Sequence, residues 1–337
     1  LMLFATQNPP GLYGGRKVLS RAFRNRFLEA HFDDVPSNEL EMILAQRCQI
    51  APSYASKIVA VFGELQRRRQ VDRVFEAKQS FATLRDLFRW GLREAIGHEH
   101  LAETGYMLLG ERARREEDRR TVKEVIEQVL RVTIDTESMY DLSSEANALR
   151  RHLGSDFNEK VLKQIRSSGL VPTRSLQRLI SLQCLAFAYR EPVLLVGEPG
   201  TGKTAVCDVV AKAFETRLEV VNCHQNTDAS DLLGGQRPLR NRSAMEATAL
   251  QLAAVCAGHN FDTIHDAALW LHHAISQKQV PRELDFYSAL RAVQAAGALF
   301  EWYDGPLVLA MNHGEHMLLD EISLADDSVL ERLNSVL

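Results

Sequence analysis

The most constraining feature of the sequence is an apolar run that leads directly into a glycine-rich turn. Residues 193–204 read Val-Leu-Leu-Val-Gly-Glu-Pro-Gly-Thr-Gly-Lys-Thr, and the last eight match the pattern GxxxxGK[ST]. Glycines let backbone N–H groups turn inward around phosphate oxygens, and a helix that follows them offers its positive end to the same anion. The run therefore predicts a buried strand over 192–196, a phosphate-binding loop and a helix over 203–214, as in an α/β domain.

Each part of this loop has an expected contact with a nucleotide. We expect the backbone to surround the phosphates, Lys203 to bridge the β- and γ-phosphates and the Thr204 hydroxyl to bind Mg²⁺. The predicted nucleotide-binding residues are Gly197, Glu198, Pro199, Gly200, Thr201, Gly202, Lys203 and Thr204. The predicted cofactors are ATP and Mg²⁺.

A second apolar run ends in two acidic residues. The sequence His-Met-Leu-Leu-Asp-Glu occupies residues 316–321. Many strands end in this way, so the pattern is weak alone, but together with the loop it predicts a hydrolytic half-site. Asp320 would join the Mg²⁺ shell, and Glu321 would polarise the attacking water. Because both acids are present, the sequence favours hydrolysis over binding alone.

The motifs come in an unusual order for one complete ATPase module. The chain has 337 residues, and Asp320 lies only 17 residues from its end (337 − 320 = 17). Elements that usually follow such carboxylates are found instead within residues 1–131. The order predicts a window of a longer polypeptide, which holds the end of one module and the start of the next.

The front of the chain supplies further candidate catalytic residues. Asn8 follows an apolar run and could orient a water beside a γ-phosphate, although a turn asparagine before two prolines explains it equally well. Arg24 and Arg26 lie on one short segment from which an arginine could stabilise developing charge in a neighbouring subunit. A surface cluster of cations is the alternative for both. Arg85, two residues after the expected N-cap Thr83, could be an ordinary exposed helix residue.

Hydrophobic periodicity predicts the remaining elements. In residues 1–170 we expect strands over 1–7 and 28–32, helices over 18–27, 37–49, 53–70, 83–96 and 99–130, helix N-caps at Ser37 and Thr83, a break near Gly110, and a linker over 131–170. Further along we expect a helix over 173–190, strands at 217–222 and at the acidic run, a glycine-bearing loop over 231–235 and mostly helical structure over 244–304. The alternation of strands and helices around the loop predicts a parallel sheet that is covered on both faces.

Composition excludes several classes of protein. Five cysteines without CxxC spacing argue against a disulfide framework or a zinc site and favour packed thiols in a reducing compartment. A net charge of −4 gives no electrostatic case for direct nucleic-acid binding. His224, His313 and His316 lack metal-ligand spacing, and packing or exposure explains them better. No apolar run reaches the length of a membrane span, so we expect no membrane partner.

Taken together, these residues resemble the AAA+ class of ring ATPases and, within it, the dynein-related midasin family. The likeness is carried by residues 5–9, 19–27, 83–87, 221–227, 231–238, 304–308 and 319–337. By this resemblance the first three stretches are the sensor 1 strand with Asn8, the arginine-finger segment and the sensor 2 helix with Arg85. Arg26 is the closest match to the finger, and Arg24 is the second.

The resemblance also implies a domain organisation. Residues 1–34 would be the C-terminal part of a preceding AAA large domain, 35–131 a helical AAA small domain, 132–170 a linker, and 171–337 the N-terminal part of the next large domain. The implied fold class is an α/β P-loop NTPase (AAA+) large domain with a parallel sheet and a helical insertion, plus an all-α small (lid) domain. An arginine from a later module would then complete the Walker half-site, and Arg24 or Arg26 would serve an earlier module. Whether Arg85 acts within its own module or across an interface stays open.

The function implied by the resemblance is that of an AAA+ mechanoenzyme. This chain and its partners, the neighbouring AAA modules of the same polypeptide, would form a ring. ATP hydrolysis in that ring would remodel pre-60S ribosomal particles in the nucleolus and nucleoplasm. That work would release assembly factors and make the particle competent for nuclear export, with the particle contacted by regions outside this chain. The alternatives are a dynein-type motor ring, a MoxR-type AAA+ chaperone, or a structural ATP site that binds without turnover.

Overall fold

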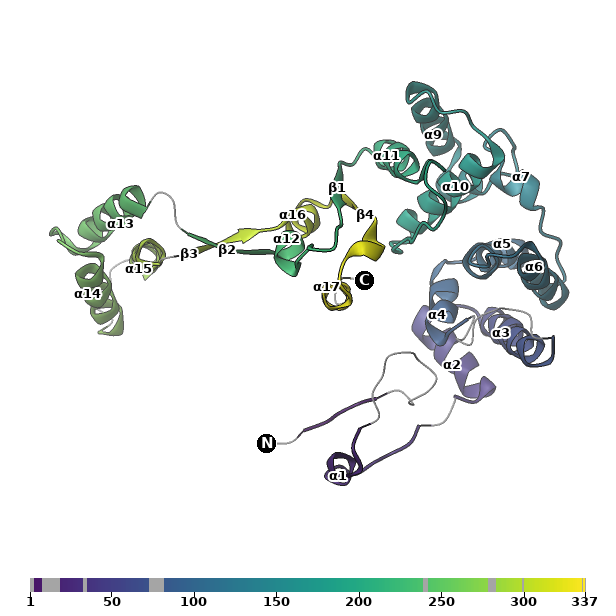
Figure 1. Ribbon diagram of the computed structural model, residues 1–337, viewed down its shortest axis with the longest axis horizontal. Helices are drawn as coiled ribbons and strands as arrows, with labels where there is room; N and C mark the ends of the chain where they lie inside the picture. The colour runs from purple at the N-terminus through teal and green to yellow at the C-terminus, as the bar shows by residue number, and fades with distance from the viewer. Residues whose placement is uncertain are drawn as a thin grey trace. The chain divides into compact units, whose positions relative to one another are not determined.

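The computed structural model describes residues 3–7, 19–32, 35–72, 82–238, 242–277, 283–298, 300–334 and 336, and it divides into two units (Figure 1). The first unit contains Leu1–Ser155 and Cys184–Glu191, and the second contains Asp156–Gln183 and Pro192–Leu337. Helix α10 (Arg174–Ala188) therefore begins in the second unit and ends in the first. Among the described residues, no helix combines the length and the apolar character needed to cross a bilayer.

Within its described residues, the regular secondary structure of the first unit is entirely helical. Its elements are α1 (Arg21–Arg24), α2 (Ser37–Cys48), α3 (Pro52–Asp72), α4 (Leu84–Leu92), α5 (Gly97–Gly105), a π-helix (Tyr106–Gly110), α6 (Glu116–Leu130), α7 (Thr136–Tyr140) and α8 (Ala148–Leu153). Trp90 of α4 lies at the centre of the core, only 1% exposed, and its indole N–H donates to the carbonyl of Leu101 at 2.9 Å. Gly105 is required beside it, because a Cβ there would lie 2.2 Å from the indole ring.

Local sequence signals predicted most of this unit correctly. The helices expected over 37–49, 53–70 and 83–96 are confirmed as α2, α3 and α4, and the expected break near Gly110 is confirmed at the end of the π-helix. Thr83 caps α4, with its backbone N–H donating to Asp86 Oδ2 at 2.8 Å. The N-cap predicted at Ser37 is wrong, because the extended residue before α2 is Pro36 and Ser37 is already helical.

The two strands predicted at the front of the chain do not form in the described residues. Residues 3–7 and 28–32 have no regular secondary structure, and Leu28 and Phe32 are 99% and 98% exposed. An apolar run becomes a strand only when a neighbour accepts its backbone hydrogen bonds and a second layer covers its side chains. The helix expected over 18–27 is shorter than predicted and is reduced to α1, which Ser20 caps through a 3.2 Å hydrogen bond from the Phe23 N–H.

Residues 131–170, predicted as a linker without periodicity, contain α7, α8 and α9 (Ser155–Ser167). Asp135 and Asn147 cap α7 and α8 by accepting backbone N–H groups. Met139 and Leu149 are buried, so these helices contribute to a core. Helices α7 and α8 have five and six residues, too short to establish a 3.6-residue period in the sequence.

The second unit is an α/β domain with a helical insertion. Beyond α9 and α10 it contains α11 (Lys203–Ala213), β1 (Leu218–Asn222), α12 (Ala229–Leu233), β2 (Gly234–Pro238), α13 (Arg242–Ala257), α14 (Ile264–Ser276), α15 (Glu283–Gly297), β3 (Phe300–Asp304), α16 (Pro306–His313), β4 (His316–Asp320), a 3₁₀ turn (Ile322–Leu324) and α17 (Asp327–Leu333). The predicted helices over 173–190 and 203–214 and the strands over 217–222 and 316–320 are confirmed as α10, α11, β1 and β4.

Strands β1 and β4 form the predicted parallel pair, with Asn222 opposite Asp320. Val221 and Leu319 pack on one face against Leu232 of α12, Leu307 of α16 and residues of α17. Helix α11 lies against both strands as well, and the ring of Phe214, just after it, meets the edge of His316. Helices therefore pack against the sheet, but the predicted cover of both faces is only partly formed in the described residues, since Val220 of β1 is 43% exposed.

The strand predicted over 192–196 is not formed. Leu194 and Val196 are 72% and 88% exposed, and no strand of the described residues pairs with this segment. The apolar character of the run was identified correctly, but a strand also needs a hydrogen-bonding neighbour, which the described part of the chain does not provide.

Strands β2 and β3 form an antiparallel ribbon that carries the helical insertion (Figure 1). The prediction of mostly helical structure over 244–304 is confirmed by α13, α14 and α15, which share a core around Ala253, Leu271 and Val293. The loop predicted over 231–235 is wrong, because these residues belong to α12 and β2. Gly234 allows two backbones to approach closely: its φ is +104°, and a Cβ there would lie 2.0 Å from the carbonyl oxygen of Tyr303.

Candidate nucleotide-binding site

The predicted phosphate-binding loop lies immediately before helix α11. Gly200 and Gly202 have φ angles of +79° and +85°, a region that glycine adopts without steric cost. The Thr201 hydroxyl closes the turn by donating to the carbonyl of Glu198 at 2.9 Å. The loop thus presents its backbone at the amino end of an eleven-residue helix, where N–H groups lack intrahelical partners and favour an anion.

Lys203 directs its charge back into the loop. Its ammonium donates to the carbonyl oxygens of Gly197 and Glu198, at 2.9 Å each. A positive charge is therefore held among the backbone groups of the loop and beside the positive end of α11. This combination of charge and orphan N–H donors fits phosphate oxygens.

The loop and the acidic strand end meet at one point, although they are 116 residues apart. The Thr204 hydroxyl donates to Asp320 Oδ2 at 3.4 Å. Asp320 is held in place because its carbonyl oxygen accepts the N–H of Cys223 at 2.9 Å, while its Oδ1 accepts that of Glu321 at 3.1 Å. A hydroxyl and a carboxylate are the oxygen ligands that Mg²⁺ accepts beside nucleotide phosphates and water.

This donor set fits magnesium better than a metal held by protein side chains alone. Among the described residues, no group of three or more His, Cys, Asp or Glu side chains is arranged to hold a metal ion. Mg²⁺ commonly takes only one or two protein ligands and completes its shell with substrate phosphates and water. Thr204 and Asp320 provide that number.

Glu321 follows Asp320 in an uncommon backbone conformation. Its φ of +52° lies in the left-handed region, which non-glycine residues occupy at some energetic cost. The residue is exposed and precedes the 3₁₀ turn at Ile322–Leu324. This geometry turns the chain sharply at the carboxyl end of β4 and leaves the Glu321 side chain accessible beside the predicted metal ligand.

Two buried thiols, those of Cys207 and Cys223, lie near Asp320. The sequence alone did not predict this position. Burial raises the pKa of Cys207 and of Cys223, and the negative charge of Asp320 adds to the increase in both pKa values. Gln183 of α10 donates to Cys207 Sγ at 3.2 Å, which partly opposes the increase. Both thiols therefore stay protonated and serve as packing groups, as the scattered cysteines suggested. The sequence offered one signal for the position of Cys207. It lies three residues after Thr204 on the same predicted helix, which places both side chains on one face.

The three histidines that were expected to be packed or exposed, His224, His313 and His316, differ in their surroundings. His316 forms a 2.7 Å hydrogen bond with the Thr216 hydroxyl through Nδ1, and burial lowers its pKa, so it is neutral. His224 Nδ1 accepts the Asn226 N–H at 3.2 Å. His313 is exposed at the end of α16. These hydrogen bonds of His316 and His224 join them to Thr216 and Asn226 and not to the loop.

The other candidate catalytic residues belong to the first unit. Arg24 forms hydrogen bonds of 2.5 and 2.8 Å with both carboxylate oxygens of Glu29, and Arg26 is exposed after α1. Arg85 is exposed in the first turn of α4. Asn8 lies outside the described residues. The roles proposed for these four residues stay predictions.

The structure adds a supporting ion pair beside Arg85. Asp86 is 4% exposed and accepts hydrogen bonds from Arg112 at 2.5 and 2.9 Å. Burial alone would raise the pKa of Asp86, but hydrogen bonds from Arg112 and Thr83 outweigh it and lower the pKa. Arg112 therefore pairs with a buried carboxylate.

Two family models match the chain. A midasin AAA lid domain matches residues 39–133, and an AAA domain of the dynein-related subfamily matches residues 192–261 and 290–337. The unmatched residues between the two parts of the second match, 262–289, fall within the helical insertion. A lid domain followed by an AAA domain is the order expected for adjacent modules on one polypeptide.

Two curated relatives match the chain over its whole length. It is 42% identical over 366 residues to midasin of Dictyostelium discoideum and 34% identical over 354 residues to midasin of Giardia intestinalis. The chain spans only 6% and 7% of the lengths of these relatives. The matches select one of the families that the sequence left open: the chain belongs to the midasin family of dynein-related AAA+ proteins.

Proposed function

We propose that the loop over 197–204 and the acidic pair at 320–321 form one half-site at which ATP is bound with Mg²⁺ and hydrolysed. The observation that supports this most directly is the 3.4 Å contact between the Thr204 hydroxyl and Asp320 Oδ2. It joins the two predicted metal ligands at the end of the phosphate-binding loop. AAA+ family membership supports nucleotide binding in general, and this contact supports the more specific assignment.

Each residue of the half-site has a distinct role in the proposal. The loop backbone and Lys203 would bind phosphate oxygens, and Thr204 and Asp320 would hold the metal. Mg²⁺, when bound, supplies charge neutralisation and orientation of the phosphates. Glu321, next to the metal ligand and accessible, would orient the attacking water and accept its proton.

A single half-site lacks one element that phosphoryl transfer requires. Charge that develops on the phosphate must be stabilised by a positioned cation, and in ring ATPases an arginine from an adjacent module does this. In the proposal, another module of the same polypeptide supplies that arginine to this site. Arg26, or Arg24 in second place, would serve a nucleotide held elsewhere, and Arg85 would act as a sensor within its module or across an interface.

The proposed role of the parent protein follows from the midasin family. ATP turnover in its ring would remodel pre-60S ribosomal particles in the nucleolus and nucleoplasm, and would release assembly factors before export. The neighbouring AAA modules are the direct partners of this chain, and the particle would be reached through other regions. Because the chain spans a small fraction of its relatives, these activities are proposed for the whole protein.

The test is ATP hydrolysis by the full-length parent, wild type against Glu321→Gln, with nucleotide occupancy at this loop measured in parallel. We expect lower turnover with ATP retained at the site, because the substitution removes the base and leaves the binding residues intact. Glu331→Gln, an exposed carboxylate of α17, is the matched control and should behave as wild type. Unchanged turnover with nucleotide still bound would identify a structural ATP site instead.

A further inference from the structure

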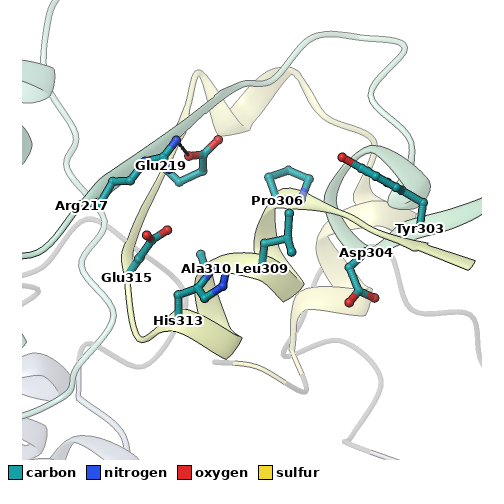
Figure 2. Close-up of a pocket in the computed structure, with 9 residues that line it drawn as sticks. All are labelled: Arg217, Glu219, Tyr303, Asp304, Pro306, Leu309, Ala310, His313 and Glu315. Carbon is teal, nitrogen blue, oxygen red and sulfur yellow. Dashed lines mark ion pairs between the residues drawn. The ribbon is translucent and has the colours of Figure 1, made fainter.

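A cavity of about 270 Å³ lies in the second unit at the end of the sheet opposite the nucleotide half-site (Figure 2). Arg217 and Glu315, which line it, directly precede β1 and β4. Asp320 and the loop contact lie at the carboxyl end of the same parallel strands. The cavity is therefore separate from the proposed ATP site.

The lining combines an apolar floor with acidic ends. Pro306 and Leu309 of α16 lie at its centre, with Glu219 and Glu315 at one end and Asp304 beside Tyr303 at the other (Figure 2). This distribution suits a ligand with an aliphatic part and a cationic group, because each part then meets a surface of matching polarity.

The charges of the lining are unbalanced. Three carboxylates (Glu219, Asp304 and Glu315) accompany one guanidinium, that of Arg217, so these four groups carry a formal charge of −2 (1 − 3 = −2). Arg217 pairs with Glu219 at 3.3 Å, and Asp304 accepts the indole N–H of Trp302 at 2.8 Å. The half-buried Glu315 carboxylate has no hydrogen bond or ion pair with the described residues. The cavity thus disfavours anions, and Glu315 offers an unused acceptor to a cation.

We propose that this cavity receives a lysine or arginine side chain from an extended segment of a protein partner. The aliphatic stem would lie along Pro306 and Leu309, and the charged group would donate to Glu315, with Asp304 within the same cavity. A metal ion fits less well, since no three of the described His, Cys, Asp or Glu side chains, the three carboxylates of this lining included, are placed so that they could hold one ion.

An extended segment is favoured over a free amine by the strand that borders the cavity. Strand β1 pairs with β4 along one edge, and no strand of the described residues pairs with its other edge. Unpaired N–H and C=O groups on such an edge can bind the backbone of an added strand. A side chain projecting from that strand would then be able to enter the cavity beside Glu219 of β1.

The direct test is binding of a fluorescent peptide, Val-Thr-Arg-Thr-Val with blocked ends, to the full chain. In the matched control peptide, citrulline replaces arginine and keeps its shape without its charge. We expect saturable binding of the arginine peptide. The affinity of the citrulline peptide should be lower by a factor of about ten or more. Glu315→Gln should weaken the arginine peptide about fivefold or more, whereas Glu331→Gln should leave it unchanged. Lys203→Ala should also leave it unchanged, because that residue belongs to the other end of the sheet.

Several outcomes would overturn the proposal. One such outcome is that the protein binds the arginine and citrulline peptides with equal affinity, and another is that Glu315→Gln and Glu331→Gln bind the arginine peptide equally well. Either result would show that the cavity does not recognise the charge. No saturable binding up to about 1 mM would remove the site itself. Spermidine that binds as tightly as the peptide would point to a free polyamine as the occupant. Circular dichroism checks the fold of each variant, and Asp304→Asn replaces Glu315→Gln if the latter is misfolded.

Discussion

The two units of the chain differ in how they support their candidate functional residues. In the first unit, helix α4 with Arg85 is capped by Thr83, tied through Asp86 to Arg112 and anchored by a tryptophan that is 1% exposed. In the second unit, the phosphate-binding loop follows a segment in which Val196 is 88% exposed. The sensor candidate is therefore fixed by contacts within its own unit, whereas the loop is supported mainly by α11 and its contact with Asp320.

The largest expected effect tests how far the first unit depends on its core. Trp90→Ala should destabilise that unit by about 3–5 kcal/mol, because it empties a fully buried site in the core and removes the indole donor to the Leu101 carbonyl, which keeps the hydrogen bond from the Thr104 hydroxyl. Hydrogen–deuterium exchange should show that the variant exchanges faster than wild type in helices α2 to α6. The exchange rates of α11, β1 and β4 should change much less. The control is Trp302→Ala, whose side chain is 61% exposed and whose loss should change little. Equal loss of protection in both units would contradict the independence of their cores.

The second prediction concerns the loop and separates function from stability. Lys203→Ala should weaken ATP binding about 100-fold. It removes the positive charge that the loop carbonyls of Gly197 and Glu198 hold in place for the phosphates. Its ammonium is not part of a core, so the thermal unfolding of the chain without nucleotide should not change. Lys212→Ala, an exposed lysine at the end of the same helix, is the control. Normal ATP affinity in Lys203→Ala would remove the loop from the proposed site.

The same contrast explains what could be predicted from the sequence. Helices α2, α3 and α4 were predicted because their signals are local: apolar spacing over helical runs of nine residues or more and, for α4, the capping residue Thr83. The strand over 192–196 and the pairing of β2 with β3 depend on a neighbour far along the chain, and no local pattern specifies that neighbour. Gly234 looked like a loop residue, although it serves a close approach to Tyr303.

Motif chemistry predicted one long-range contact that periodicity could not. Thr204 and Asp320 were expected to meet because both would bind one metal ion, and the structure brings them within 3.4 Å. The pairing of Arg112 with Asp86 carried no such signal, since Arg112 is followed by a run of mixed charges that suggests a solvated surface. A chemical requirement shared by two residues is thus more informative over distance than composition is.

That ion pair gives the third prediction, which asks whether the support of α4 is electrostatic. Asp86→Asn should destabilise the first unit by about 2 kcal/mol, because it removes the buried carboxylate that pairs with the partly exposed Arg112 guanidinium. The pKa of Asp86 is lowered in the folded chain, so its contribution is present above the ordinary value of 3.8 and is lost as the pH falls below it. The difference between wild type and variant should therefore shrink in urea unfolding below pH 3.8. A constant difference at all pH values would mean that packing, and not charge, is responsible.

The smallest expected effect concerns a pair of half-buried histidines in the first unit. His100 Nε2 lies 2.8 Å from His152 Nδ1, which is also 2.7 Å from the Tyr189 hydroxyl. Burial lowers the pKa of His100 and lowers that of His152 to about 3, and the nearby Arg151 acts in the same direction on both pKa values. Both rings are therefore neutral in the folded chain at physiological pH.

This neutral pair should make the first unit less stable in mild acid. Below the ordinary histidine value of 6.5 the unfolded chain binds protons that the folded chain excludes, so stability falls as the pH falls. For His152 the loss between pH 6.5 and 5.5 should be about 1 kcal/mol. Urea unfolding of His152→Gln should show a shallower pH dependence over this interval, whereas His265→Gln, an exposed histidine of α14, should keep the wild-type slope. If the slope is the same in all three proteins, the histidine pair does not control the acid sensitivity, and the contrast between a self-supported first unit and a contact-dependent loop would rest on Trp90 and Asp86 alone.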